Sequence, residues 1–469
     1  MEALNSSNIS QVTIFKSSNI VLVDVILPAI LIVLNGKIDR IYQYQNESEA
    51  EKILNNHNGT VYDFGSLVLM PGVIDSHVHV NEPGRTDWEG FATATRAAAV
   101  GGVTTIVDMP LNSIPPTTTL ENLIVKVKAA EGKTSVDVGF WGGVIPRNEK
   151  NLKDLVNAGV VGFKCFMCPS GVDEFPYVQE KDIISALKEL HSLNSLLAFH
   201  AEMESEGNVS EPTGNPSFYS TFLETRPPSM ELRALEVATT YCKNSNTRCH
   251  IVHLSSAEGL KIIKEAKSAG VNLTAETCHH YLNIAAEDIP NGATQYKCTP
   301  PIRQKSNQDE LWKALKDKDL DMVVSDHSPC TEDLKTPGNF LTAWGGIASL
   351  QFDLSLMWTG ARQRNFSLIE VSKLLSANPA KLVGFDKFKG TIKEGMDADF
   401  VIWNPEDKFT VERSIIYHRN KLTPYEGRTL FGVVVATVVR GQFVYNKGKF
   451  ADVPKGQLLL NKEFLTKIN

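Results

Sequence analysis

The chain has 469 residues, of which 42% are hydrophobic and 22% are charged. This length predicts two to three domains, or one large barrel with an appended domain, and the apolar fraction excludes a disordered or fibrous protein. The 47 basic and 54 acidic residues give a net charge of −7. This balance argues against a protein that mainly holds nucleic acid or an anionic membrane.

Seven cysteines are scattered through the chain. An odd number in a chain of this size favours a reducing compartment over a disulfide framework. The most apolar early stretch, residues 20–34, contains Asp24 and Pro28 and is shorter than the roughly 20 residues that cross a bilayer. It also lacks a basic lead-in and a small-residue cleavage site, so we expect no secretory signal and a cytoplasmic protein.

The two ends of the chain are predicted to form short strands separated by turns. Near the start, branched and aromatic residues are concentrated at 12–15, 20–26, 29–34 and 38–42. The same pattern returns after about residue 388, at 399–403, 409–411, 431–440 and 442–445. We expect the terminal regions, 1–66 and 389–469, to pair into one small β-sandwich domain.

Between these regions, strand-like runs alternate with helical patterns. Eight such runs lie at 68–80, 103–109, 136–144, 162–167, 196–202, 249–255, 273–282 and 321–325. Helical periodicity is clear at 87–100, which ends at Gly101-Gly102, and at 258–269. Eight strand–helix units predict a (β/α)₈ barrel of the TIM type over residues 67–388, and such barrels carry their chemistry at the C-terminal ends of the strands.

The first of these runs ends in Asp75-Ser76-His77-Val78-His79. Because side chains alternate along a strand, the two histidines share a face and lie about 7 Å apart. Two imidazoles on one face make a chelating pair for zinc or a similar ion. A bare His-x-His is more often two unrelated residues, but its position at a strand end favours metal binding.

Four of the other runs finish on residues that can bind cations or carry protons: Lys164, His200, His253 and Asp326. An ammonium group among apolar neighbours, as at Lys164, is costly unless it is paired. Any one of these residues alone is more often a hydrogen-bonded core residue. Four in one barrel are hard to explain as solvated surface, so we expect them to meet His77 and His79 at one rim.

Six candidate ligands are too many for one tetrahedral ion and fit two. Two divalent cations about 3.5–4 Å apart can share a hydroxide, which is a strong nucleophile near neutral pH. Lys164 is the odd member, because an ammonium group cannot ligate a cation. We expect zinc, although the same ligand types also suit manganese, cobalt or iron.

The whole pattern resembles the binuclear cyclic amidohydrolases, the family of dihydroorotase, dihydropyrimidinase (hydantoinase) and allantoinase. The resemblance extends from Pro71-Gly72 to the segments 390–392 and 395–399. It implies that His77, His79 and Asp326 hold one metal and that His200 and His253 hold the other. It further implies that Lys164, carboxylated by CO₂, bridges the two ions, and that Asp326 is the catalytic residue that shuttles the proton.

Three motifs are similar to the allantoinase branch of this family, at 81–90, 108–117 and 325–330. Dihydroorotases carry an arginine two residues after the second histidine, where Asn81 stands here, so the anion clamp for dihydroorotate is missing. Dihydropyrimidinases carry a tyrosine five residues after the lysine, where Pro169 stands here, so the oxyanion donor is undefined. The resemblance implies hydrolysis of allantoin to allantoate. Substrate contacts are expected at Asn81, Ser170, Thr299, Ser328 and Gly345.

Two alternative functions are a dihydropyrimidinase or hydantoinase that acts on other cyclic ureides, and a non-catalytic scaffold related to these enzymes. All six ligand positions are filled, which argues against the scaffold. Cys165 and Cys168 form a Cys-x-x-Cys pair, but its place on a barrel strand favours packing over redox chemistry. The resemblance also implies a homo-oligomer, either a tetramer or a dimer, with a small molecule as the substrate.

Overall fold

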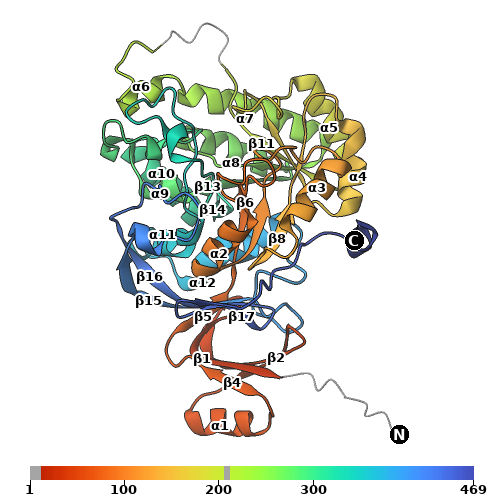
Figure 1. Ribbon diagram of the computed structural model, residues 1–469, viewed down its shortest axis with the longest axis vertical. Coiled ribbons are helices and arrows are strands. Elements are labelled where there is room, and N and C mark those ends of the chain that lie inside the picture. Colours follow the sequence, from red (N-terminus) through yellow and green to blue (C-terminus); the bar gives the residue numbers. More distant parts are fainter. Residues whose placement is uncertain (1–11, 205–211, 469) are drawn as a thin grey trace.

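The computed structural model describes residues 12–204 and 212–468, which form a parallel barrel and an adjoining sheet domain (Figure 1). The barrel strands are β6 (Val73–Val78), β7 (Val103–Asp108), β8 (Asp137–Phe140), β9 (Gly142–Gly143), β10 (Phe163–Phe166), β11 (Leu196–His200), β12 (Arg248–Ile251), β13 (Leu273–Cys278) and β14 (Met322–Val324). Pairing runs through β6-β7-β8 and through β9-β10-β11-β12-β13-β14. A parallel bridge between Val78 and His327 links the first strand to the segment just after the last, and the predicted (β/α)₈ barrel is confirmed.

Helices pack around the outside of this barrel (Figure 1). The longer ones are α2 (Phe91–Val100), α3 (Leu120–Ala130), α5 (Glu180–Ser192), α7 (Pro228–Ser245), α8 (Leu260–Ser268), α10 (Lys305–Asp317) and α11 (Asp353–Ala361). The shorter ones are α4 (Leu152–Ala158), α6 (Tyr219–Glu224), α9 (His279–Asn283), α12 (Leu368–Ser372) and α13 (Asn378–Leu382). In α5, the buried residues Ile183, Leu187 and Leu190 recur every three to four positions, which gives the helix one apolar stripe for the barrel.

The sheet domain combines both ends of the described chain, drawn in red and in blue beneath the barrel in Figure 1. Its strands are β1 (Thr13–Val21), β2 (Ile26–Leu34), β3 (Lys37–Gln43), β4 (Thr60–Asp63), β5 (Val68–Pro71), β15 (Phe400–Thr410), β16 (Thr429–Val439), β17 (Gln442–Asn446) and β18 (Lys449–Phe450). β5 joins the two halves, because it pairs parallel with β1 and antiparallel with β15. Phe15, Leu69 and Phe400 are fully buried in one shared core, as expected for a β-sandwich domain.

The predicted run at 68–80 contains two strands with different roles. β5 belongs to the sheet domain and β6 to the barrel, and Gly72 separates them. A Cβ atom at Gly72 would lie 2.2 Å from Oγ1 of Thr104, so only glycine lets the chain pass this close to β7. The limits predicted for the domains, at 66/67 and 388/389, stay a prediction, and residues 1–11 lie outside the described residues.

Two local predictions at the ends of the chain are wrong. The break predicted between the runs at 12–15 and 20–26 lies inside β1, where the pairing with β2 continues past a register shift between Ser17 and Ile20. The predicted runs at 399–403 and 409–411 are one strand, β15. Helices α1 (Glu47–Asn55), which begins at the cap Asn46, and α14 (Lys462–Ile468) were not predicted.

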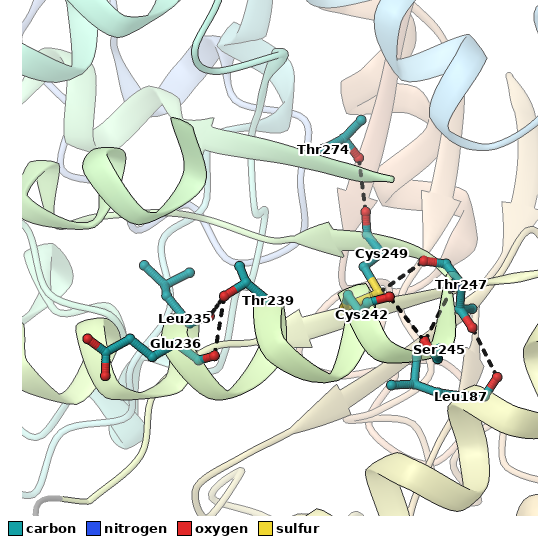
Figure 2. The surroundings of a disulfide bond; sticks show 9 residues. All are labelled: Leu187, Leu235, Glu236, Thr239, Cys242, Ser245, Thr247, Cys249 and Thr274. Carbon is teal, nitrogen blue, oxygen red and sulfur yellow. Dashed lines mark hydrogen bonds between the residues drawn. A yellow bond between two sulfur atoms is a disulfide. The ribbon is translucent and has the colours of Figure 1, made fainter. Parts of the chain in front are cut away.

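A disulfide joins Cys242 and Cys249, where the end of α7 turns into β12 (Figure 2). The sequence favoured a reducing compartment over a disulfide framework, and this pair departs from that expectation. The two residues are seven positions apart, and the turn between them brings their Cα atoms to 6.2 Å. Thr247 ties this turn to α5, because its hydroxyl donates to the carbonyl of Leu187 at 3.1 Å. The other five cysteines are buried free thiols.

Among the described residues, no helix combines the length and the apolar character needed to cross a membrane.

Candidate metal centre

Four of the predicted histidines lie side by side at the C-terminal ends of the barrel strands. The ring centroids of His77 and His79 are 5.5 Å apart, and those of His77 and His253 are 5.3 Å apart. His200 continues the series, with its ring centroid 4.6 Å from that of His253. Side chains from β6, from the end of β11 and from the loop after β12 therefore meet at one rim.

Asp326 approaches this group from the loop after β14. Its Oδ1 atom lies 3.2 Å from Nε2 of His77 and 3.4 Å from Nε2 of His79. The ligand atoms of these three residues lie within 4.8 Å of one another, close enough to hold one cation.

Lys164, on β10, is buried and lines the same cavity as His200, His253 and Asp326. Burial lowers the pKa of its amine to about 8, against the opposing charges of Asp326 and Glu276. An amine with this pKa is partly neutral near physiological pH, and only a neutral amine adds CO₂. The placement of Lys164 therefore suits the carboxylation that the family resemblance implies.

His200 is oriented by two neighbours outside the histidine group. Its Nε2 atom lies 2.7 Å from Glu202, and its ring stacks on Phe166 with the centroids 4.3 Å apart. Arg226 donates to the same carboxylate at 2.8 Å and balances its charge. Because Nε2 is engaged by Glu202, Nδ1 is the nitrogen left for a cation.

Burial lowers the pKa of His77, His200 and His253, which favours the neutral imidazole that binds cations. Nε2 of His77, although Asp326 approaches it to 3.2 Å, forms no hydrogen bond within the described residues, and neither does Nδ1 of His253; both atoms are buried. Such orphaned nitrogens are costly unless a ligand satisfies them. The donor set, made of imidazoles and a carboxylate, therefore fits divalent metal ions.

Two of these residues have unusual backbone geometry. His253 has a φ of 38° and Asp326 a φ of 45°, in the left-handed region that non-glycine residues rarely adopt. Each follows the end of a barrel strand, where the left-handed step turns the chain over the rim. Strain of this kind is typical of functional sites.

Glu276, on β13, holds candidate metal ligands in place through hydrogen bonds. This residue was not predicted. Its carboxylate lies 2.5 Å from Nδ1 of His77 and 2.9 Å from Nε2 of His250. It also accepts a hydrogen bond from the backbone N–H of His253. His250 thus holds the carboxylate that orients two candidate ligands. Glu276 is the single acid in the strand-like run at 273–282, and that was the available signal.

His279 and His280, at the start of α9, lie near the centre. Nε2 of His279 is 3.4 Å from the carboxylate of Asp353. A ligand atom of His280, together with one of Cys278, lies within 4.8 Å of Asp326. Both histidines are fully buried, and burial lowers the pKa of each to about 4.

The cavity above the candidate ligands contains four of the five predicted substrate contacts: Ser170, Thr299, Ser328 and Gly345. The fifth, Asn81, is not among the residues that line this cavity, and its amide donates to the carbonyl of Pro329 at 3.2 Å. The cavity also contains Asn112 and Trp344, which were not predicted as contacts.

Cys165 and Cys168 are both buried free thiols. Burial raises the pKa of each thiol, that of Cys168 to about 12, so the reactive thiolate is disfavoured. This agrees with the packing role predicted for the pair.

Comparison with known proteins covers nearly the whole chain. Residues 68–444 match the model of the amidohydrolase family. The allantoinase of Streptomyces avermitilis is 47% identical over 446 residues, which cover 95% of this chain and 98% of that protein. The allantoinase of Saccharomyces cerevisiae is 46% identical over 86% of this chain and 88% of its own length.

Solved structures show the same likeness. An L-hydantoinase (dihydropyrimidinase) from Arthrobacter aurescens has a TM-score of 0.89 at 29% identity and covers 96% of this chain and 100% of that chain. A D-hydantoinase has a TM-score of 0.85 at 27% identity and covers 97% of this chain. Both matches include the sheet domain as well as the barrel.

Proposed function

The chain belongs to the amidohydrolase family, and we propose that it hydrolyses the hydantoin ring of allantoin to give allantoate. The observation that carries this proposal is the convergence of four histidines and Asp326 around the buried amine of Lys164 at one rim of the barrel. Identity of 47% to an allantoinase over 95% of the chain supports the choice of substrate.

We propose that two divalent cations, zinc in the first instance and manganese, cobalt or iron as alternatives, bind at this rim. His77, His79 and Asp326 would hold one ion, and His200 and His253 the other. Lys164 would bridge them as a carbamate, whose negative charge replaces the positive charge of a buried ammonium. The bound cations would lower the pKa of a water molecule and polarise the ring carbonyl.

Asp326 is proposed to move the proton. Its carboxylate would accept a proton from the attacking water while the water oxygen bonds to the ring carbonyl carbon. When the C–N bond of the ring breaks, the same carboxyl group would return the proton to the departing nitrogen. The exposed fraction of Asp326 is 8%, so the group is sheltered from solvent and still faces the cavity.

A hydantoinase or dihydropyrimidinase is the second candidate, because solved proteins with those names share the fold over nearly the whole chain. Pro169 stands at the position where dihydropyrimidinases carry a tyrosine, which favours the allantoinase. A non-catalytic scaffold is disfavoured, because every expected ligand position carries a residue that can serve as a ligand.

The test is turnover by the purified, metal-loaded protein on allantoin, hydantoin and dihydrouracil, with metal content measured on the same sample. We expect allantoin to give the highest kcat/KM. Asp326→Asn should reduce kcat at least about 10²-fold, the usual scale for a positioned acid–base group, while the thermal midpoint changes little. A fully active Asp326→Asn variant would remove the proton-shuttle role, and faster turnover of dihydrouracil would favour the second candidate.

We further propose a homo-oligomer, either a tetramer or a dimer, and a cytoplasmic location. One relative is named as a mitochondrial allantoinase, from Aquarana catesbeiana, so the compartment needs a direct test. Light scattering of the purified protein and fractionation of the source cells would test the two proposals.

A further inference from the structure

Asn112 lies beside the candidate metal centre, and only one of its two side-chain amide atoms has a polar partner. It follows β7 and lines the cavity that contains Lys164, His253 and Asp326. Its exposed fraction is 4%, and its Nδ2 atom lies 3.2 Å from Nδ1 of His79 in this structure. The other amide atom, Oδ1, is buried and has no hydrogen-bond partner within the described residues. An unsatisfied amide atom at a cavity wall calls for a ligand.

Metal binding by His79 decides which amide atom faces which neighbour. Nε2 of His79 points toward Asp326 at 3.4 Å and is therefore the nitrogen available to a cation. A neutral imidazole that ligates through Nε2 carries its proton on Nδ1, and this N–H must donate. In the loaded protein Asn112 therefore has to present Oδ1 to His79, which requires a half-turn of its amide from the orientation seen here. The Nδ2 group, with its two N–H donors, then becomes the atom without a partner.

We propose that the Nδ2 group of Asn112 donates a hydrogen bond to the carbonyl oxygen of the substrate as that oxygen gains negative charge. This inference rests on the proposed function and supplies the oxyanion donor that the sequence left undefined at Pro169. When water adds to the ring carbonyl, the π electrons move onto the oxygen, and they return when the C–N bond breaks. The N–H of Asn112 stays intact throughout and stabilises the charge between these two events.

The loop around Asn112 is built to hold this side chain still. Asn112 has a φ of 68°, in the left-handed region that asparagine tolerates better than most residues. Arg85 donates to its backbone carbonyl at 2.8 Å and also pairs with Glu174. The segments 81–90 and 108–117 are joined further by a 2.8 Å bond from the N–H of Ile114 to the carbonyl of Pro83. Two of the three motifs similar to allantoinases therefore cooperate to position one amide.

Two other polar groups at the cavity wall, those of Ser170 and Trp344, are less suitable. The hydroxyl of Ser170 donates its proton to the carbonyl of Phe175 at 2.6 Å, so it cannot donate to a substrate at the same time. Nε1 of Trp344 also lacks a partner among the described residues, but the indole is only partly buried and packs edge-on against Trp88. Asn112 is distinguished by its direct contact with a candidate metal ligand, which ties its position to that of the cations.

Two substitutions separate the donor from the support of His79. Asn112→Asp keeps an oxygen for the N–H of His79 and replaces the donor by a second oxygen. We expect it to retain its metals against a chelator as well as the parent does, while kcat on allantoin falls about 10²- to 10³-fold. Asn112→Ala removes both contacts, so we expect the same loss of kcat and, in addition, about 10- to 100-fold weaker metal binding.

Asn194→Asp is the matched control, because Asn194 also adopts a left-handed φ, of 50°, and is exposed at the end of α5. It should leave both readouts unchanged. An Asn112→Asp variant with kcat within a few-fold of the parent would overturn the donor role, as would a loss of kcat seen only in Trp344→Phe. Rapid metal loss from Asn112→Asp would overturn the amide orientation. A parent that opens no cyclic ureide would refute the proposed function and the donor role with it, whereas the chelator result would still decide the orientation.

Discussion

The carboxylate of Glu276 contacts the candidate metal centre at three points, through His77, His250 and the backbone of His253. An acceptor on Nδ1 of His77 keeps the proton on that nitrogen and leaves Nε2 free for a cation. Negative charge at this place also raises the affinity of the imidazole for a metal. Glu276 therefore acts on the metal through a ligand, as a positioning residue.

Glu276→Gln tests this role. The amide keeps the shape of the side chain but loses the charge, and it brings an N–H₂ group toward a nitrogen of either His77 or His250. We expect metal affinity to fall about 10- to 100-fold, measured by competition with a chelator, and activity to return when excess metal is added. Glu287→Gln, at a residue of a short surface turn, is the control. Unchanged metal affinity in Glu276→Gln would show that Glu276 serves only to pack β13.

A site residue could be predicted from the sequence where its polar side chain interrupts an apolar run. His200 and His253 could be predicted, because each ends a strand that is otherwise hydrophobic. Asn112 could not, because it lies in a loop of mixed composition, and nothing local shows which loop atoms face the cavity. The partner of His77, Glu276, is 199 positions away in the chain, so only the closed barrel brings the two together.

At the scale of elements, the alternation of strands and helices was sufficient to predict the barrel. It was not sufficient to predict where each helix or strand begins and ends. The helix predicted from residue 87 begins at Phe91, because the N–H of Gly90 bonds back to the carbonyl of Val80 and the residues before it form a loop. The residues of β5 were predicted as part of the first barrel strand, because an apolar run does not reveal which sheet its residues join. Helix α1 was missed, although Asn46 and Glu49 form its N-terminal cap.

The disulfide between α7 and β12 offers a test at the same scale. Closing a loop of about eight residues restricts the unfolded chain and stabilises the fold by about 2 kcal/mol. We therefore expect Cys242→Ser/Cys249→Ser to lower the thermal midpoint of the purified protein. The parent treated with a strong reductant should match the double variant. Without reductant, thiol titration of the denatured parent should detect the five free cysteines only. Seven reactive thiols would show that the pair is reduced in the protein as purified.

For the whole molecule, the sheet domain is tied to the base of the barrel by a buried cluster of charges centred on Lys389. Its Nζ lies 2.8 Å from Asp137 of β8 and 2.5 Å from Asp399, which directly precedes β15. Burial alone would lower the pKa of Lys389, but the surrounding carboxylates outweigh it and raise the pKa above its usual value. Arg440, at the end of β16, pairs with Asp137 as well. The barrel and the sheet domain, which takes its strands from both ends of the described chain, thus share one ionic cluster.

Replacing Lys389, at the centre of this cluster, should lower the free energy of unfolding by more than the loss of a surface ion pair does. Lys389→Met fills a similar volume but leaves Asp137 and Asp399 buried with less compensation, so we expect a loss of about 3–5 kcal/mol, read as a large fall in the thermal midpoint. Lys373→Met is the matched control, because Lys373 also links the barrel to the N-terminal strands, through Asp24, but both side chains of this pair are largely exposed. That pair should contribute no more than about 1 kcal/mol. Equal midpoints for the two variants would mean that the sheet domain is held to the barrel by apolar packing and β5 pairing, with no net contribution from the buried charges.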